Sequence, residues 1–205
     1  MRERILRQGA QEMGLDLTDF QVSSLLGYLD LLQKWNKAYN LTAIRNELEM
    51  VRLHLLDSLT VVPFIGDGPV ADIGTGAGLP GVVIAIMKPD CRVVMVDSNI
   101  KKVNFVRQAI GQLGLKNAQV THTRVEELSP EPCFKQITSR AFASLEDMID
   151  WTQHLVCPEG EFLAMKGQTP SQEIQTLSER FQIESHPLSV PGELGERCLV
   201  VLKHG

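Results

Sequence analysis

Long apolar segments are absent from this sequence. No apolar run approaches the roughly 20 residues that a membrane-spanning helix needs. The first residues, MRERILRQGAQEMGLDLT, carry charges throughout and contain no apolar core of a secretory signal. These two absences lead us to expect a cytoplasmic chain that does not associate with membranes.

Paired or clustered cysteines are also missing. The four cysteines are Cys91, Cys133, Cys157 and Cys198, and they form no CxxC pair. They are not grouped with the five histidines in a spacing typical of metal ligands. We therefore expect reduced thiols and no metal site. Cys133 follows a proline but precedes an expected strand, so we interpret it as a structural residue rather than a nucleophile.

Excess positive charge is lacking as well. The 20 Lys and Arg residues against 25 Asp and Glu residues give a net charge of −5. This balance argues against bulk electrostatic binding to nucleic acid, although it leaves room for a local basic patch. The 205 residues, 43% hydrophobic and 22% charged, are enough for one globular domain with an extension.

The first third of the chain has a helical pattern. Thr18 and Gln21 fit a capping box, and leucines follow them at helical spacing. The segment GDGP at 66–69 is the best boundary in the sequence. We therefore divide the chain into a helical extension, residues 1–66, and a main domain, residues 67–205.

Strands and helices alternate after this boundary. The expected strands are 69–73, 92–97, 118–123, 135–141, 161–166, 181–190 and 197–203, and the expected helices are 80–88, 99–113, 144–155 and 170–180. Such alternation predicts an α/β fold with a mostly parallel seven-stranded sheet and helices on both faces. No helix separates the last two strands, so we expect an antiparallel last strand.

A glycine-rich turn follows the first expected strand, in the stretch VADIGTGAGLPGVVIAI. Gly74, Gly76 and Gly78 occupy alternate positions there. Glycine permits positive φ and close approach of a ligand to the backbone. Asp97 ends the second expected strand, where an acid that binds a ribose belongs. Its alternative role is to cap the helix that begins near Asn99.

Asp72 decides between the cofactors that such turns bind. A dinucleotide would place its pyrophosphate at the start of the following helix, and a carboxylate two residues before the first glycine would repel it. S-adenosylmethionine carries an ammonium and a sulfonium instead, and both favour a nearby carboxylate. The pattern D-x-G-x-G-x-G therefore favours S-adenosylmethionine, with a dinucleotide as the alternative.

Two further loops supply candidate site residues. After the third expected strand, Val125 and Glu126 flank the position of an adenine ring, although Glu126 is equally a solvated charge at a helix start. Arg140 and Lys166 lie at the ends of the fourth and fifth expected strands. Arg140 can bind a cofactor carboxylate or a guanine, or form a structural ion pair. Lys166 either meets an RNA phosphate or is solvated.

Basic and aromatic residues gather in the stretch KWNKAYNLTAIR. Lys34, Lys37 and Arg45 form a candidate RNA-binding patch around Trp35 and Tyr39. For the two aromatic residues we favour packing of the extension on the main domain. Downstream, His54 and Asp57 are three residues apart on one helix face, which makes them candidates for a structural hydrogen bond.

Several stretches together resemble one known family over nearly the whole chain. They are KWNKAYNLTAIR (34–45), HLLDSL (54–59), ADIGTGAGLPG (71–81), TRVEEL (123–128), SRAFASL (139–145) and LAMKGQ (163–168). The sequence is similar to the bacterial 16S ribosomal RNA guanine-N7 methyltransferase G family, first called glucose-inhibited division protein B.

The resemblance implies a Rossmann-like fold that uses S-adenosylmethionine, with an N-terminal helical extension. It implies methylation of a guanine N7 in the decoding-region loop of 16S rRNA, so the expected partner is this RNA or the small ribosomal subunit. The family's cofactor positions correspond here to Gly74, Leu79, Val125 with Glu126, and Arg140.

The residues themselves agree with an N7 target, because N7 is a lone pair that loses no proton on methylation. The place after the fourth strand reads SRAFASL, without the Asn/Asp-Pro-Pro-aromatic motif of exocyclic-amine methylases. Arg140 would then position the guanine or the cofactor and no general base is expected. Two other classes remain open, which are a nicotinamide-dependent oxidoreductase and a non-catalytic RNA-binding or assembly factor.

Overall fold

The structure is a computed structural model that describes residues 1–129, 132–140, 142 and 144–205. The N-terminal part consists of helices and helical turns: α1 Arg2–Glu12, α2 Asp19–Tyr39, α3 Glu47–Met50, the π-helical turn η1 Val51–Leu56, α4 Asp57–Leu59 and the 3-10 turn η2 Val62–Phe64. The expected capping box is confirmed, because Thr18 and Gln21 bond to each other's backbone at the start of α2.

The rest of the chain alternates between strands and helices. Its elements are β1 Val70–Ile73, α5 Gly81–Met87, β2 Val93–Asp97, α6 Ile100–Leu113, β3 Ala118–His122, the 3-10 turn η3 Val125–Glu127, β4 Phe134–Ser139, α7 Leu145–Thr152, β5 Val156–Lys166, α8 Ser171–Leu177, β6 Phe181–Pro187 and β7 Cys198–His204. The expected α/β class is confirmed, and all seven expected strands are present. Strand β5 begins at Val156 rather than at residue 161, and β6 ends at Pro187 rather than at residue 190. Residue 141, the last of the expected strand 135–141, lies outside the described residues.

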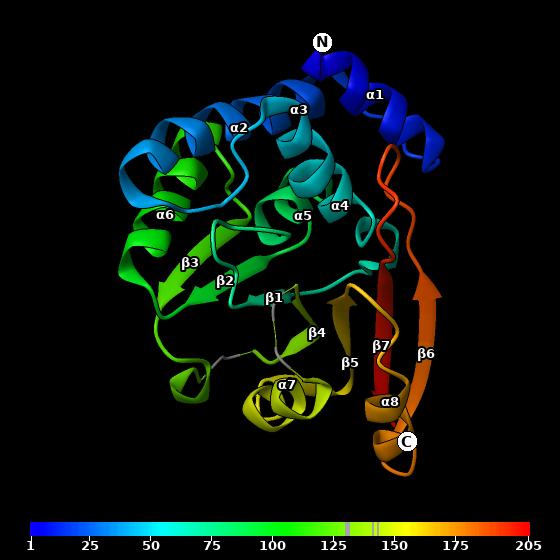
Figure 1. The fold of residues 1–205 in the computed structure, drawn as a ribbon. Coiled ribbons are helices and arrows are strands. Elements are labelled where there is room, and N and C mark those ends of the chain that lie inside the picture. The colour runs from blue at the N-terminus through cyan, green and yellow to red at the C-terminus, as the bar shows by residue number, and fades with distance from the viewer. Residues whose placement is uncertain (130–131, 141, 143) are drawn as a thin grey trace.

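One sheet contains the seven strands in the order β3-β2-β1-β4-β5-β7-β6 (Figure 1). Strands β1 to β5 pair in parallel, whereas β7 runs antiparallel to both β5 and β6. The predicted antiparallel last strand is therefore confirmed. The strand order reverses between β1 and β4, and ligands of such sheets bind beyond the carboxyl ends of the strands at that point.

Both faces of the sheet are covered, which explains the apolar strands. In β2, Val93 and Met95 belong to the hydrophobic cluster of α2, α5 and α6, whereas Val94 and Val96 belong to the cluster of α7. Figure 1 shows these two helical layers on opposite sides of the strands. A strand buried on both faces reads as a continuous apolar run.

Helix α2 packs directly on the main domain. The hydroxyl of buried Tyr28 donates to the carbonyl of Ala77 at 2.7 Å, so α2 contacts the glycine turn. The rings of Trp35 and Phe105 lie 5.8 Å apart, which joins α2 to α6. The predicted packing of the extension on the main domain is confirmed for Trp35 and wrong for Tyr39, which is 45% exposed and lies against the ring of Trp35 in its own helix. The division at residues 66–69 stays a prediction.

The expectation that all cysteines are reduced is wrong for Cys133 and Cys157, which form a disulfide. The two residues flank the paired positions Phe134 and Val156 on neighbouring strands β4 and β5. Their sequence separation of 24 residues gave no sign of this proximity. Cys133 does precede β4, so it lies at the strand end opposite to the expected ligand, and Cys91 and Cys198 are buried free thiols.

Among the described residues, no helix combines the length and the apolar character that crossing a membrane requires.

Candidate functional site

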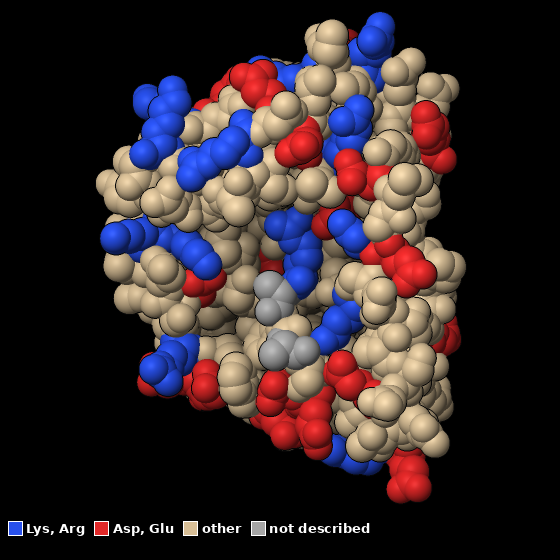
Figure 2. All heavy atoms as spheres, in the orientation of Figure 1, with Lys and Arg blue, Asp and Glu red and all other residues tan. Residues whose placement is uncertain are grey.

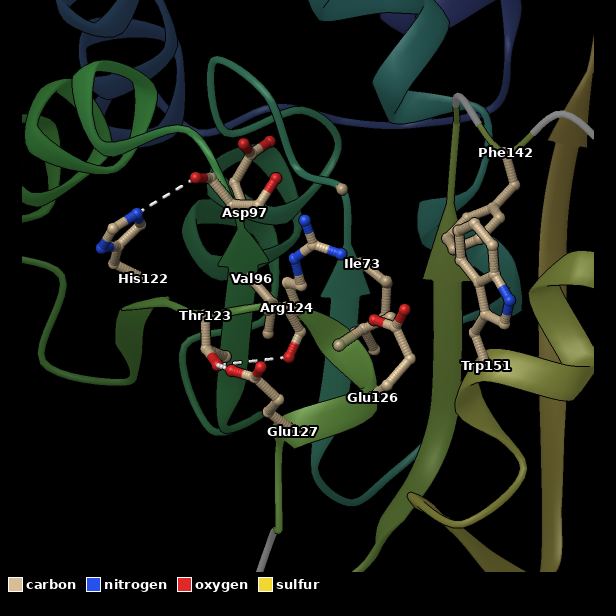
Figure 3. Close-up of a pocket in the computed structure, with 13 residues that line it drawn as sticks. Ile73, Val96, Asp97, His122, Thr123, Arg124, Glu126, Glu127, Phe142 and Trp151 are labelled. Atoms are coloured by element: carbon tan, nitrogen blue, oxygen red, sulfur yellow. Dashed lines mark hydrogen bonds between the residues drawn. The ribbon is translucent and has the colours of Figure 1, made fainter.

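A cavity of about 630 Å³ opens at the carboxyl ends of β1, β2 and β3 (Figure 3). Its lining consists of the strand ends, the loops that follow them and two aromatic residues: Ile73, Gly74, Val96, Asp97, Ser98, His122, Thr123, Arg124, Val125, Glu126, Glu127, Phe142 and Trp151. We call it the cofactor cavity, because the sequence places the expected cofactor at this edge of the sheet.

Of the three alternate glycines in the turn, Gly74 lines the cofactor cavity, whereas Gly76 and Gly78 do not. Gly74 has a φ of +65°, and a Cβ built on it would meet no atom within 4 Å. The bare α-carbon of Gly74 therefore faces open space. Gly78 has a φ of +90°, and a Cβ there would lie 2.7 Å from Val82. Glycine is needed at Gly74 for the backbone conformation and at Gly78 for close packing as well.

Asp97 stands at the rim of this cavity with both carboxylate oxygens fixed. Its Oδ2 accepts from the N–H of Gly76 at 2.8 Å, and its Oδ1 accepts from the N–H of Asn99 at 2.8 Å. The side chain of Asn99, rather than Asp97, caps α6. Each oxygen keeps a further lone pair, so the carboxylate can still accept from ligand hydroxyls.

Asp72 lies beneath the glycine turn and is fully buried. Its Oδ2 accepts from the hydroxyl of Thr75 at 2.6 Å and from the N–H of Gly81 at 2.7 Å. Within the described part of the chain, its Oδ1 has no hydrogen-bond partner. Burial raises the pKa of Asp72 to about 6, although the two bonds to Oδ2 oppose the shift. Asp72 does not line the cavity directly.

Some of the other predicted cofactor residues line the cofactor cavity and others do not. Val125 is buried and Glu126 is exposed, and both line the cavity. Gly76 and Leu79 do not line it; Gly76 donates its N–H to Asp97, and Leu79 is packed in the hydrophobic core. Their contribution to the cavity is therefore the shape of the turn.

An aromatic pair forms the far wall of the cofactor cavity and was missed in the sequence. The rings of Phe142 and Trp151 lie 5.5 Å apart in an edge-to-face arrangement. In Figure 3 they stand opposite to Asp97 and His122, with Glu126 between. Trp151 projects from α7 and remains 45% exposed, which is unusual for so large an apolar side chain.

Arg140 does not line the cofactor cavity. It lines a second cavity of about 320 Å³, together with Ile44, Leu53, His54, Asp57, Met165, Lys166, Gly167, Leu188 and Arg197. Its Nη1 donates to the carbonyl of Leu53 and to Oδ2 of Asp57, both at 3.2 Å. Arg140 therefore forms the structural ion pair that the sequence left open as its alternative role, and its partner is Asp57. Arg197, which donates from Nε to Oδ1 of Asp57 at 3.1 Å, was missed in the sequence.

The expected bond between His54 and Asp57 is wrong. His54 Nε2 lies 2.9 Å from the hydroxyl of Thr42, and Nδ1 lies 3.2 Å from the carbonyl of Leu53. Asp57 is occupied by the two guanidinium groups instead, which bind a carboxylate more strongly than a neutral imidazole does. Burial, followed by the charge of Arg140, lowers the pKa of His54 to about 4.

Lys166 lines the second cavity and contacts a residue of the cofactor cavity. Its Nζ lies 3.4 Å from the carbonyl of Phe142 and 3.9 Å from Glu173, and only 14% of its side chain is exposed. The alternative of a solvated lysine is therefore wrong. Lys166 lines the second cavity, whereas Phe142 lines the cofactor cavity. Arg140 lines the second cavity and Phe142 lines the cofactor cavity, so the two cavities are neighbours.

Lys34, Lys37 and Arg45 are exposed and line one shallow depression beside α2, together with Asp30 and Glu47. Arg45 is held by the side chain of Asn40 at 3.0 Å. Figure 2 shows Lys and Arg side chains on the face that carries the central hollow, whereas Asp and Glu gather at its lower edge over α7. The structure brings the three basic residues together, as the sequence predicted.

Solved structures with the same fold include S-adenosylmethionine-dependent methyltransferases. One from Aquifex aeolicus superposes with a TM-score of 0.58 at 18% identity, over 75% of this chain and 93% of that chain. TrmK of M. capricolum, solved with S-adenosyl-homocysteine, gives 0.57 at 12% identity, over 72% of this chain and 67% of that chain. Identities this low show a shared fold only.

Sequence relatives are much closer. The ribosomal RNA small subunit methyltransferase G of Marinobacter nauticus is 48% identical, over 96% of this chain and 92% of its own length. That of Ectopseudomonas mendocina is 50% identical, over 97% of this chain and 94% of its own length. The family model described as rRNA small subunit methyltransferase G (GidB) matches residues 21–200. The chain therefore belongs to the family of rRNA small subunit methyltransferase G.

Proposed function

We propose that this protein methylates N7 of a guanine in the decoding-region loop of 16S rRNA, with S-adenosylmethionine as methyl donor. The observation that carries the proposal is the carboxylate of Asp97, which backbone N–H groups fix at the rim of a cavity beside the glycine turn. Family membership supports the RNA substrate. The chain then acts as an enzyme in the cytoplasm, without a metal and away from membranes.

The residues of the cofactor cavity suit S-adenosylmethionine, which supplies a methyl group on a sulfonium centre. Asp97 has lone pairs left for both ribose hydroxyls. The backbone of Val125 and Glu126 provides polar groups for the adenine, and Gly74 allows the ligand to approach the main chain. The buried Oδ1 of Asp72 places negative charge below the turn, where it attracts an ammonium or a sulfonium.

A dinucleotide fits the same residues poorly. Its pyrophosphate would approach the turn under which Asp72 is buried, near the carboxylate of Asp97. Two carboxylates at that position repel a phosphate rather than attract it. The nicotinamide-dependent oxidoreductase is therefore the weaker alternative, as the sequence already suggested.

Alignment of the reactants carries the proposed catalysis. Guanine N7 attacks through a lone pair, so no proton has to leave and no general base is required. His54, with its pKa near 4, is neutral at physiological pH and holds Thr42 rather than a substrate proton. Arg140 is the proposed positioning residue, because Leu53 and Asp57 fix its guanidinium at the end of β4.

RNA is proposed to reach this edge of the sheet across the basic depression of Lys34, Lys37 and Arg45, with Lys166 nearer to the cofactor cavity. These side chains are exposed or lie in cavities, so phosphates can approach them. The substrate is 16S rRNA or the small ribosomal subunit that contains it.

Incubation with small ribosomal subunits that lack the modification tests the proposal. With tritiated S-adenosylmethionine, we expect label in 16S rRNA, and mapping of the modified base should find a guanine N7 in the decoding-region loop. Asp97→Ala should abolish labelling. Arg92→Gln should not, because Arg92 lies at the amino end of β2, away from the cavity at the carboxyl ends of the strands. No transfer by a protein that binds S-adenosyl-homocysteine would favour the non-catalytic RNA-binding factor.

A further inference from the structure

The second cavity has a charge pattern that the proposed cofactor does not use. Three cationic side chains, Arg140, Lys166 and Arg197, line it together with one carboxylate, Asp57. Their side chains are between 14% and 29% exposed, so they are accessible from the cavity without being free in solvent. His54 also lines the cavity but is neutral, because burial and Arg140 lower its pKa to about 4. Positive charge therefore prevails there.

Asp57 orients the two guanidinium groups. Its side chain is only 8% exposed, and its two oxygens bind different arginines, Oδ2 taking Arg140 and Oδ1 taking Arg197. One carboxylate thus joins the end of β4 to the hairpin between β6 and β7. The bridge spans sequence separations of 83 and 140 residues. A carboxylate shared in this way fixes two cations side by side, where they would otherwise repel each other.

The backbone fixes the same groups from both sides. Arg140 also donates to the carbonyl of Leu53 in the π-helical turn, and π-helical turns are frequent at functional sites. On the hairpin, Leu188 donates its N–H to the carbonyl of Arg197 at 2.8 Å, which closes the hairpin beside the cavity. The arginines are therefore preorganised before any ligand arrives.

Each guanidinium keeps donors for a ligand. Among the described residues, the bonds to protein atoms occupy Nη1 of Arg140 and Nε and Nη1 of Arg197. The remaining N–H groups form the paired geometry that suits a phosphate or a carboxylate. An anion in the cavity would meet these donors and the ammonium of Lys166.

We propose that the second cavity binds a backbone phosphate of the RNA next to the target guanine. The inference rests on the proposed function, because RNA supplies the anion. Lys166 contacts the carbonyl of Phe142, whose ring lines the cofactor cavity, so the two cavities are neighbours along the strand ends. A phosphate held by Arg140 and Arg197 would anchor the strand while its neighbouring base enters the cofactor cavity.

Arg197→Gln tests the site without touching the cofactor cavity. We expect the variant to bind unmethylated 16S rRNA about tenfold more weakly or worse, since it removes a charge-assisted hydrogen bond to phosphate. The slope of log K against log salt is negative and should become less negative by up to about 0.7, the value for one phosphate of single-stranded RNA. The affinity for S-adenosyl-homocysteine, measured by calorimetry, should stay within about twofold of wild type.

Arg92→Gln is the matched control, because Arg92 is exposed and lies at the amino end of β2, whereas both cavities lie at the carboxyl ends of the strands. An equal reduction of RNA affinity in both variants would show that the effect comes from the net charge of the protein and not from this cavity. That result would overturn the proposal. Wild-type RNA affinity and salt slope in Arg197→Gln would do the same. Weaker binding of S-adenosyl-homocysteine with unchanged RNA binding would assign the cavity to the cofactor carboxylate instead.

Asp57→Asn separates orientation from charge. The variant makes the cavity more positive, so simple electrostatics predicts tighter RNA binding. We expect weaker binding, because an amide oxygen cannot hold both guanidinium groups in place. Tighter binding by a folded variant would contradict the proposed role of Asp57. Methyl transfer by the wild-type protein is measured in parallel, and its absence would count against the proposed function rather than against the phosphate site.

Discussion

The carboxylate of Asp97 accepts the N–H of Gly76 at 2.8 Å and so joins the end of β2 to the turn that follows β1. Its other oxygen accepts the N–H of Asn99, also at 2.8 Å. The carboxylate is therefore held in place before a ligand binds, with only its outward lone pairs free. Preorganised acceptors of this kind bind ligand hydroxyls at a smaller entropic cost than mobile side chains do.

Asp97→Ala should weaken the binding of S-adenosyl-homocysteine at least about a hundredfold. The substitution removes two charge-assisted bonds to the ribose, each worth roughly 1.5–3 kcal/mol. Isothermal calorimetry measures the change. Asn99→Ala is the control, because it removes the cap of α6 without removing the carboxylate. An Asp97→Ala variant with wild-type affinity would refute the role of this residue in cofactor binding.

Asp72 should make the stability of the protein depend on pH. Burial raises its pKa to about 6, above the usual value of 3.8, so the folded state holds its proton more tightly than the unfolded state. The stabilisation is complete below about pH 4 and is lost as the pH rises through 6. We expect the free energy of unfolding to fall by roughly 3 kcal/mol over this range because of Asp72.

Urea unfolding of the wild type and of Asp72→Asn between pH 4 and 7.5 checks this expectation. The asparagine does not titrate, so the difference in unfolding free energy between the two proteins should change below about pH 6 and level off above it. A constant difference across the range would show that Asp72 has an ordinary pKa. Thr75→Val serves as a comparison, since it removes the bond to Oδ2 but leaves the buried carboxylate.

Local features of the site were predictable from the sequence. Each of these features lies in a short segment in which a strand is followed by a turn, as at the glycine turn, Asp97 and Val125. The residue types in such a segment indicate its backbone conformation directly. The antiparallel β7 was predictable because no helix separates it from β6. Such features require no knowledge of which distant segments meet.

Contacts between distant segments were not predictable. Arg140 meets Asp57 across 83 residues and Arg197 meets it across 140 residues, so spacing gave no indication of the shared carboxylate. Cys133 and Cys157 meet because their neighbours Phe134 and Val156 pair, at the end of the β4–β5 ladder that a register shift separates from the rest. The sequence assigned Asp57 to His54 instead, because the two are close along the helix.

The basic depression beside α2 should contribute to RNA binding. Reversing the charge of Lys34, Lys37 and Arg45 together should weaken binding of 16S rRNA at moderate salt. The slope of log K against log salt should become less negative by about 0.7 for each RNA phosphate that the variant no longer neutralises. Filter binding at several salt concentrations gives both quantities.

The control for this experiment is a triple charge reversal at Lys88, Arg92 and Lys116. These residues precede β2 and β3, at the edge of the sheet opposite to both cavities. The control changes the net charge of the protein by the same amount. If both triple variants bound RNA equally weakly, or if reversal at Lys34, Lys37 and Arg45 had no effect, the depression would have no specific role in RNA binding.

Methyl transfer should depend little on pH between about 6.5 and 9, because an N7 lone pair needs no general base. His54 has a pKa near 4 and titrates below this range, and Asp72, with a pKa near 6, is already mostly ionised at its lower end and does not line the cofactor cavity. Burial raises the pKa of Tyr28, which places its titration above the range. None of these three groups should therefore leave a step in the rate profile.

Arg140→Lys sharpens the same test. One ammonium cannot replace a guanidinium that is held by both Leu53 and Asp57, so we expect the single-turnover rate to fall roughly tenfold or more. The profile should remain flat, because a positioning residue moves no proton. His122→Asn is the control for the histidine in the cofactor cavity. A wild-type rate that rises tenfold per pH unit would contradict this expectation if replacement of one acid or histidine removed the rise. Such a result would demonstrate a general base. The methylated atom would then be one that carries a proton, and not N7.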